Sequence, residues 1–396
     1  MRNCRTILLV CAAIAGATLL SGCQKIGVRN PYAGQAIRFA AGSRGTQSTK
    51  TVYGEDDVKE STTYQALNWK VNDLITIASE QAEVQNIGGN ASDYKVTKVV
   101  EGVPSTATVV NADVNGLMWS DNESVTNYQF YAAYPAVGTK GTNLTLTAKG
   151  AFSATIPSTQ SLVGQPEEKT DPKGDASITY KVYAPEMDFA YMTAAASVTI
   201  DKNTTTENAT VKLPFAPAFT AFEFYVSSQD EEIDLTEFEL VSPEKNDDYP
   251  GFVRDKLAGT FTMTAGDNST VSASDAGSSI KVDLSGTDVI DVTNGLSFTV
   301  FTVPVTNVFP LRIRFTSKDG EPETEGGEVP TKTSYLDLKY SNNEEAGANA
   351  GEPFHFQAGH KYRIHMLKLP SSQWRITITA DFDEWVDAQE EVVIYI

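Results

Sequence analysis

The sequence predicts an all-β protein made of two tandem antiparallel β-sandwich domains. Apolar and polar residues alternate with a period of two along most of the chain, and no helical periodicity lasts for three turns. Clusters of Gly, Asn, Asp and Ser separate the short alternating runs, as turns separate strands. Without helices to make βαβ crossovers, the strands are expected to pair antiparallel. The length of 396 residues fits two such domains.

The alternating runs give the expected strands in order. A polar tract at residues 201–208 lacks apolar periodicity and divides the chain roughly in half, so we expect domains at 45–205 and 206–396. A second polar tract, 318–328, reads as a long solvated loop between two strands. The expected strands cover residues 71–78, 94–100, 106–110, 128–135, 178–183 and 197–201 in the first domain, and 211–215, 222–226, 280–284, 309–315, 362–366 and 376–378 in the second.

The first 22 residues have the pattern of a signal peptide. Arg2 and Arg5 precede an apolar run at 7–20, which is too short to span a bilayer comfortably. The run ends in Leu20-Ser21-Gly22-Cys23, which resembles the lipobox of bacterial lipoproteins. We therefore expect Cys23 to be diacylated and to become the N-terminus of an outer-membrane lipoprotein. The alternative is an ordinary signal peptide that happens to contain Cys23.

Cysteine chemistry is then excluded from the mature chain. Cys4 and Cys11 leave with the signal peptide, and Cys23 carries lipid. No thiol remains for a disulfide, a thiolate metal site or a nucleophile.

Charge is unevenly distributed along the chain. The 31 Lys and Arg against 51 Asp and Glu give a net charge of −20, which excludes a nucleic-acid partner because no basic tract compensates it. No acidic residue precedes Glu55, whereas Lys25, Arg29, Arg38 and Arg44 do. This basic segment is interpreted as a tether or a processed leader, and residues 37–40 are its only strand-like piece.

No motif in the chain predicts catalysis, a cofactor or a metal. The G-x-S-x-G, P-loop, G-x-G-x-x-G and H-E-x-x-H patterns are missing, so we expect no enzyme. His355, His360 and His365 could suggest a zinc or copper site, but their spacing of five places neighbours on opposite faces of a strand. A polar surface is the favoured interpretation. A surface hydrolase such as a glycosidase stays open as an alternative, since it needs only two Asp or Glu that meet in a cleft, but the sequence singles out no pair among its 51 acids. Residues 381–384 lack the calcium-loop pattern.

The four tryptophans leave a different function open. If they were exposed, they could stack on sugar rings, and the protein would be a lipid-anchored glycan-binding protein. Within alternating strands they are more often core residues. The four are Trp69, Trp119, Trp374 and Trp385.

Several segments together resemble fimbrillins, the subunits of type V pili of Bacteroidales. The resemblance starts with the lipobox and the leader at 37–44, and covers nearly the whole mature chain although each motif is loose. The other segments that carry it are 67–75, 131–135, 211–215 and 358–364, followed by Trp385.

The resemblance implies a fold and an assembly mechanism. Fimbrillins have two transthyretin-like Greek-key β-sandwich domains, are exported as lipoproteins, and are cut after an arginine by a trypsin-like protease at the cell surface. Cutting releases the first strand and opens an apolar groove, which a strand of the next subunit fills by β-augmentation. The chain is accordingly expected to leave the outer membrane for an extracellular fimbrium that serves adhesion, with other pilus subunits as its partners.

Applied to this sequence, the resemblance places the cut after Arg44, because the Gly, Thr and Ser residues that follow suggest an exposed segment. Arg38 is the second candidate, but it lies in the strand-like piece. The leader removed would be residues 23–44, and its strand, 36–41, would bury Ile37 and Phe39.

The donor end is less defined by the sequence. Val392, Ile394 and Ile396 alternate as a terminal donor strand would. If residues 374–396 form a detachable two-strand appendage, the protein is a stalk subunit that can donate. If they belong to the second sandwich, the subunit accepts but does not donate, and it lies at the pilus tip. Both alternatives remain open at this point.

Overall fold

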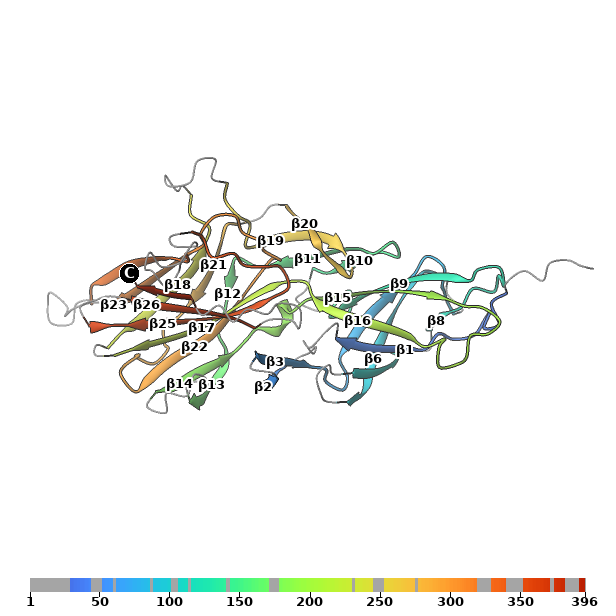
Figure 1. The fold of residues 1–396 in the computed structure, drawn as a ribbon, viewed down its shortest axis with the longest axis horizontal. Helices are drawn as coiled ribbons and strands as arrows, with labels where there is room; N and C mark the ends of the chain where they lie inside the picture. Colours follow the sequence, from blue (N-terminus) through green and yellow to red (C-terminus); the bar gives the residue numbers. More distant parts are fainter. Residues whose placement is uncertain are drawn as a thin grey trace, which may run out of the picture.

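The computed structural model is all-β and elongated, with two β-rich halves arranged end to end along its long axis (Figure 1). Its single described helix is the 3-10 turn η1 (Met187–Phe189). None of the described helical structure is long and apolar enough to cross a lipid bilayer. The structure describes residues 29–43, 52–59, 62–85, 88–100, 106–112, 115–139, 143–170, 178–229, 232–244, 253–274, 277–318, 329–339, 352–370, 374–381 and 392–395.

The first half is a closed barrel rather than two separate sheets. Its buried core contains the aromatic side chains of Tyr94, Trp119, Tyr128, Phe130 and Phe215. Because the barrel is closed, every one of its strands has a neighbour on both sides. In barrel order the strands are β1 (Phe39–Ser43), β16 (Val211–Pro217), β15 (Met192–Thr199), β9 (Asn127–Tyr134), β4 (Leu74–Ala78), β6 (Ala91–Val100) and β7 (Thr106–Asn111).

The second half is built mainly from two larger sheets that share one core. Phe224 of one sheet lies 4.5 Å from Phe238 of the other, ring centre to ring centre. One sheet has the order β13 (Val163–Thr170), β14 (Thr179–Ala184), β22 (Asn294–Thr302), β17 (Thr220–Ser228), β25 (Lys361–Lys368), β26 (Trp374–Asp381) and β27 (Val392–Tyr395). The other has the order β12 (Thr159–Gln160), β21 (Ser279–Asp283), β18 (Asp234–Val241), β23 (Arg312–Lys318) and β24 (Thr331–Asp337).

Three smaller sheets complete the described part of the fold. They are the four-stranded β10 (Thr145–Leu146), β11 (Ala151–Ile156), β19 (Gly259–Thr264) and β20 (Asp267–Ser274), the pair β2 (Val52–Lys59) and β3 (Thr62–Asn68), and the pair β5 (Glu83–Val84) and β8 (Leu117–Met118).

The strands do not divide at the expected boundary between residues 205 and 206. Strand β16 lies beyond that boundary but pairs with β1 and β15 in the barrel. Strands β11, β12 and β14 lie before it but pair with β19, β21 and β22, which lie beyond it. The polar tract at 201–208 lies in the loop that connects two strands of the barrel, β15 and β16. Local composition marks a loop, but it does not reveal which distant strands the loop joins.

The expected antiparallel pairing also needs correction. The pairs β1–β16, β12–β21, β14–β22 and β17–β25 are parallel. In each pair the two strands are far apart in sequence, and the long intervening chain makes the crossover that parallel pairing requires. Alternation predicts strands but not their directions.

Two glycines allow the halves to approach closely. Gly266, between β19 and β20, donates its N–H to Thr193 Oγ1 of β15 at 2.9 Å. A Cβ at Gly266 would lie 2.6 Å from the Cβ of Ala195, and one at Gly150 would lie 2.4 Å from the ring of Tyr131. Backbone and side chain of the two halves are therefore in direct contact at these turns.

The local strand predictions are close to the structure. The expected strand at 197–201 ends at Thr199, and that at 309–315 begins at Arg312. Arg312 and Arg314 point away from the core and pair with Asp337 at 2.6 Å and Glu239 at 2.8 Å. Most of the predicted loop at 318–328 lies outside the described residues.

Candidate functional site

Strand β1 closes the barrel between two strands that are distant in sequence. It runs parallel to β16, from Phe39 opposite Val211 to Ser43 opposite Phe215. On its other side it runs antiparallel to β7, with Phe39 opposite Val109. Removing β1 would leave both neighbours with an unpaired edge.

The leader strand also fills the barrel core. Ile37, Phe39 and Ala41 are 6%, 3% and 1% exposed, so the inward face of the segment is almost dry. The ring of Phe39 meets Tyr94 and Phe130 edge to face, at centroid distances of 5.0 and 5.4 Å. This arrangement makes the leader a structural part of the uncut barrel.

The residues before β1 are hydrogen-bonded across the end of the barrel. Ile37 N–H donates to the Leu117 carbonyl at 2.9 Å, and Gly34 N–H donates to the Trp119 carbonyl at 3.1 Å. The Tyr32 hydroxyl donates to the Thr204 carbonyl at 2.8 Å. These contacts hold the leader beyond the strand itself.

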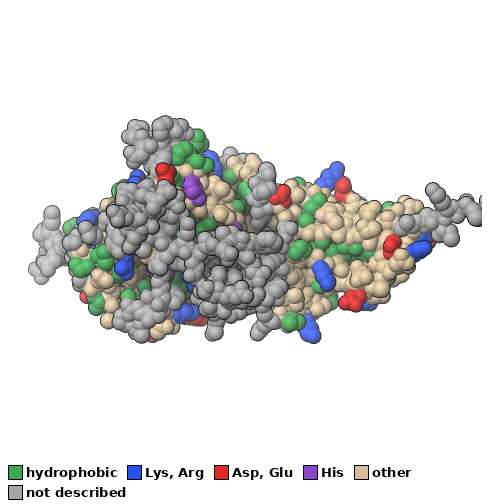
Figure 2. Space-filling view, in the orientation of Figure 1, with side chains coloured by type: hydrophobic (Ala, Val, Ile, Leu, Met, Phe, Trp, Pro, Cys, Tyr) green, Lys and Arg blue, Asp and Glu red, His purple; other side chains and the backbone are tan. Residues whose placement is uncertain are grey.

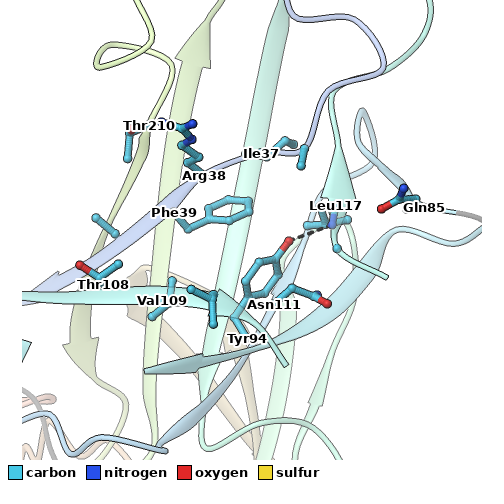
Figure 3. A pocket seen from close by; sticks show the side chains of 14 residues that line it. Ile37, Arg38, Phe39, Gln85, Tyr94, Thr108, Val109, Asn111, Leu117 and Thr210 are labelled. Atoms are coloured by element: carbon cyan, nitrogen blue, oxygen red, sulfur yellow. Dashed lines mark hydrogen bonds between the residues drawn. The ribbon is translucent and has the colours of Figure 1, made fainter. Parts of the chain in front are cut away.

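A cavity of about 620 Å³ opens beside the leader, where β1 and β7 separate (Figure 3). Ile37, Phe39, Val109 and Leu117 give it an apolar lining. The Tyr94 hydroxyl accepts a hydrogen bond from Leu117 N–H at 2.8 Å, and burial raises the pKa of Tyr94 to about 12. The phenol is therefore neutral at any physiological pH, and its ring lines the cavity in the position that this hydrogen bond holds.

The sequence-predicted site residues fall in different parts of this picture. Ile37 and Phe39 point into the barrel, whereas Arg38 is exposed and its carbonyl accepts a hydrogen bond from Val211 N–H at 2.9 Å. The strand begins at Phe39 rather than at residue 36 and runs to Ser43. Cys23 and Arg44 lie outside the described residues.

The C-terminal strands belong to the second half. Strand β26 pairs with β25 along its whole length, and Trp374, Ile376 and Ile378 are buried in the core. Strand β27, which contains Val392 and Ile394, is the outermost strand of the sheet and pairs only with β26 among the described strands. Ile396 lies outside the described residues. Of the two strands considered as donors, β26 is integral to the sheet and β27 is peripheral.

The tryptophans do not form an exposed stacking surface in the described structure. Trp69, Trp119 and Trp374 are 3%, 2% and 6% exposed. On the face seen in Figure 2, hydrophobic side chains reach the barrel surface only in small groups. Trp385 lies outside the described residues.

Each of the three histidines contacts a different neighbour. His355 Nδ1 contacts the Asn307 carbonyl at 3.0 Å, His360 Nδ1 contacts the Ala358 carbonyl at 3.0 Å, and His365 stacks on Tyr225. Within the described part of the chain, no group of three His, Cys, Asp or Glu side chains could hold a metal ion.

Sequence reasoning missed a buried ionic cluster on the seven-stranded sheet. Glu223 of β17 accepts from Lys361 Nζ at 2.7 Å and from Arg363 Nε at 3.1 Å, and all three side chains are buried. Alternation places Glu223 opposite the core face of β17, but its partners are 138 and 140 positions away in the chain. Only the parallel pairing with β25 brings them together.

Comparison with known proteins gives matches to solved structures alone. No protein-family model matches the chain, and no curated protein matches its sequence. Three of the similar solved structures are a putative cell adhesion protein from Bacteroides uniformis, a fimbrial assembly protein from Parabacteroides distasonis, and the tip fimbrial protein Mfa3 from Porphyromonas gingivalis with a C-terminal truncation.

These matches span most of both chains at low identity. The first has a TM-score of 0.45 and 14% identity, and covers 89% of this chain and 99% of the other. The second has 0.40 and 11%, with coverages of 90% and 98%, and the third has 0.37 and 10%, with coverages of 88% and 99%. The chain's structural neighbours are thus adhesion and fimbrial proteins.

Proposed function

We propose that the chain is a structural subunit of a cell-surface fimbria that assembles by release of its leader strand and insertion of a strand from another subunit, and that it serves adhesion. One observation carries the proposal. The strand that closes the barrel, β1, ends at Ser43, directly before the candidate cleavage residue Arg44. A single cut there would free the barrel-closing strand from the rest of the chain.

The physical consequence of release is a groove that must be filled again. The edges of β16 and β7 would present unpaired N–H and C=O groups, and the pockets of Ile37, Phe39 and Ala41 would be open to water. Such an edge binds an extended segment, since main-chain hydrogen bonds supply affinity and alternating pockets supply specificity. While the leader is in place, it protects the edge from premature association.

The same geometry favours Arg44 over Arg38 as the position of the proposed cut. The Arg38 carbonyl is hydrogen-bonded to β16 one residue before β1, so this peptide is held in the barrel. A cut there would also leave β1 attached to the mature chain. We therefore propose Arg44 as the residue recognised by an arginine-specific surface protease, and Cys23 as the lipid anchor to the outer membrane before processing.

The geometry supports an acceptor role more directly than a donor role. Strand β26 cannot leave without exposing Trp374, Ile376 and Ile378. If the chain donates a strand, β27 is the segment that can detach, because it lies at the sheet edge.

Intact-mass measurement of the Arg44→Ala variant tests the proposal. In wild-type cells we expect a soluble surface species that starts at Gly45, together with a membrane-retained lipidated precursor that starts at Cys23. Arg44→Ala should abolish the short species, whereas Arg38→Ala should mature normally. Maturation of Arg44→Ala to the same short form, or a wild-type protein found only in the lipidated form, would contradict the proposal.

A further inference from the structure

The outer face of the barrel around the leader strand carries basic side chains on several adjacent strands. Lys212 of β16 and Thr108 of β7 flank Ala40, and Thr108 is in turn opposite Lys98 of β6. One step along the ladder, Lys95 of β6 lies opposite Val110. Arg38 precedes β1 on the same outward side.

The orientation of this basic face follows from the pleat. Phe39, Val96, Val109 and Val211 are buried in the barrel core. Side chains alternate between the two faces of a strand, so the residues between these core positions point outward. Arg38, Lys98 and Lys212 are exposed and Lys95 is half-buried.

These four charges are not neutralised within the described structure. None of Arg38, Lys95, Lys98 and Lys212 forms an ion pair with another described residue. Asp93, an acidic residue on the same side of β6, accepts a hydrogen bond from the Thr76 hydroxyl. A face with net positive charge therefore surrounds the leader strand of a chain whose overall charge is −20.

We propose that this basic face captures the acidic C-terminal segment of a second copy of the chain. Residues 381–391 contain six carboxylates and no basic residue, and they lead directly into the alternating apolar residues 392–396. The basic face and the acidic segment have opposite charges. The basic face surrounds β1, the strand that would be replaced, and the acidic segment directly precedes β27, the strand that would replace it. This inference rests on the proposed strand insertion and names the partner segment.

The charges would act on encounter rather than on the final pairing. Opposite charges across an interface raise the association rate and fix the orientation of the partner, while salt screens them over about 10 Å at 0.1 M. Once the partner is aligned, its terminal strand lies beside the cavity at the end of the β1–β7 pairing. The pair of residues at that end is Phe39 and Val109. The strand can then replace the leader from that end.

Stopped-flow binding of a labelled peptide tests the inference. The probe is residues 381–396, and the receptor is the lipid-free chain cut after Arg44 with its leader still seated. At low salt, Lys95→Glu with Lys98→Glu should slow association by roughly tenfold, and the difference should vanish at about 0.5 M salt. Lys332→Glu on β24, in the other half of the molecule, is the matched control and should change the rate less than twofold.

A second probe does not depend on how the variants fold. In a peptide with its six acids replaced by Asn and Gln, the low-salt association rate with the wild-type receptor should fall to the high-salt value. Equal rates for the acidic and neutral peptides, or for the wild-type and doubly substituted receptors, would overturn the inference. A wild-type receptor that does not bind the acidic peptide would also overturn it. The proposed function fails separately, if no species starting at Gly45 is found.

Discussion

At the scale of single residues, Phe39 packs the leader against the aromatic core of the barrel. It is buried against Tyr94 and Phe130. We expect Phe39→Ala to lower the free energy of unfolding of the uncut protein by about 3–5 kcal/mol, because truncation leaves a cavity in a packed core. Chemical denaturation measures this change. Ala40→Ser, on the outward side of the same strand, is the control, and an equal loss in both variants would contradict the account.

The Glu223 cluster makes a prediction about pH. Burial would raise the pKa of Glu223, but the charges of Lys361 and Arg363 outweigh it and lower the pKa to about 2, from 4.5. A carboxyl with a depressed folded-state pKa stabilises the fold above its unfolded pKa, and this contribution is lost as pH falls from about 4.5 to about 2. Removing it takes away an anion that contacts two buried cations, Lys361 and Arg363.

We therefore expect Glu223→Gln to lower the free energy of unfolding by about 3–5 kcal/mol at pH 7. The gap between variant and wild type should narrow below pH 4.5 in denaturation curves recorded across pH. Glu237→Gln is the control, since Glu237 forms a solvent-exposed pair with Lys281 at 3.1 Å and should change stability by less than about 1 kcal/mol. A gap that stays constant down to pH 3 would rule out this role for Glu223.

At the scale of the elements, the turn between β19 and β20 depends on Gly266. Its φ is +78°, and an added Cβ would lie 2.7 Å from the backbone nitrogen of Ala195 in the barrel. Backbone atoms cannot yield as a flexible side chain can, so Gly266→Ala should separate the two halves locally. We expect the free energy of unfolding, measured by thermal or chemical denaturation, to fall by about 2–4 kcal/mol. The left-handed backbone at residue 266 and the steric overlap with Ala195 both contribute to this loss.

Gly286→Ala provides the matched comparison for that prediction. Gly286 also has a positive φ, +92°, but nothing lies within 4 Å of its Cβ position. Gly286→Ala should therefore lower the free energy of unfolding by only about 1 kcal/mol, the cost of the left-handed backbone alone. If both variants lose the same amount, the contact of Gly266 with Ala195 contributes nothing to stability.

The elements also mark how far the sequence could predict this fold. Period-two alternation placed β4, β7, β9, β16 and β17 within a few residues, because side-chain alternation is a local consequence of the pleat. The same pattern contains no information on partners. Val211–Pro217 alternates equally well in either half, and only the pairing with β1 and β15 assigns it to the barrel.

The candidate site was predictable to the same extent. Ile37 and Phe39 alternate within the only strand-like piece of the leader. The cavity beside them, the basic face and the Glu223 cluster require residues from strands far apart in the chain. Nonlocal pairing supplies those contacts, so no window of the sequence contains them.

At the scale of the whole molecule, the two halves have separate cores. The leader residues Ile37, Phe39 and Ala41 belong to the barrel core and make no part of the core of the second half. Loss of the leader should therefore loosen one half and spare the other. Local opening is governed by the contacts of each cooperative unit, so the two halves can differ in protection within one chain.

Hydrogen exchange on the chain with and without its leader measures this difference. After removal of the leader, amides of β7 and β16 should exchange at least tenfold faster, because both strands lose a hydrogen-bonded neighbour and the core beneath them opens. Amides of β17 and β22, at the centre of the seven-stranded sheet, should keep their protection. Adding a strand that fills the groove should restore slow exchange in β7 and β16. Faster exchange throughout both halves would mean that the barrel and the second half unfold as one unit. The barrel could not then stay folded between the loss of its leader and the binding of a strand from another subunit.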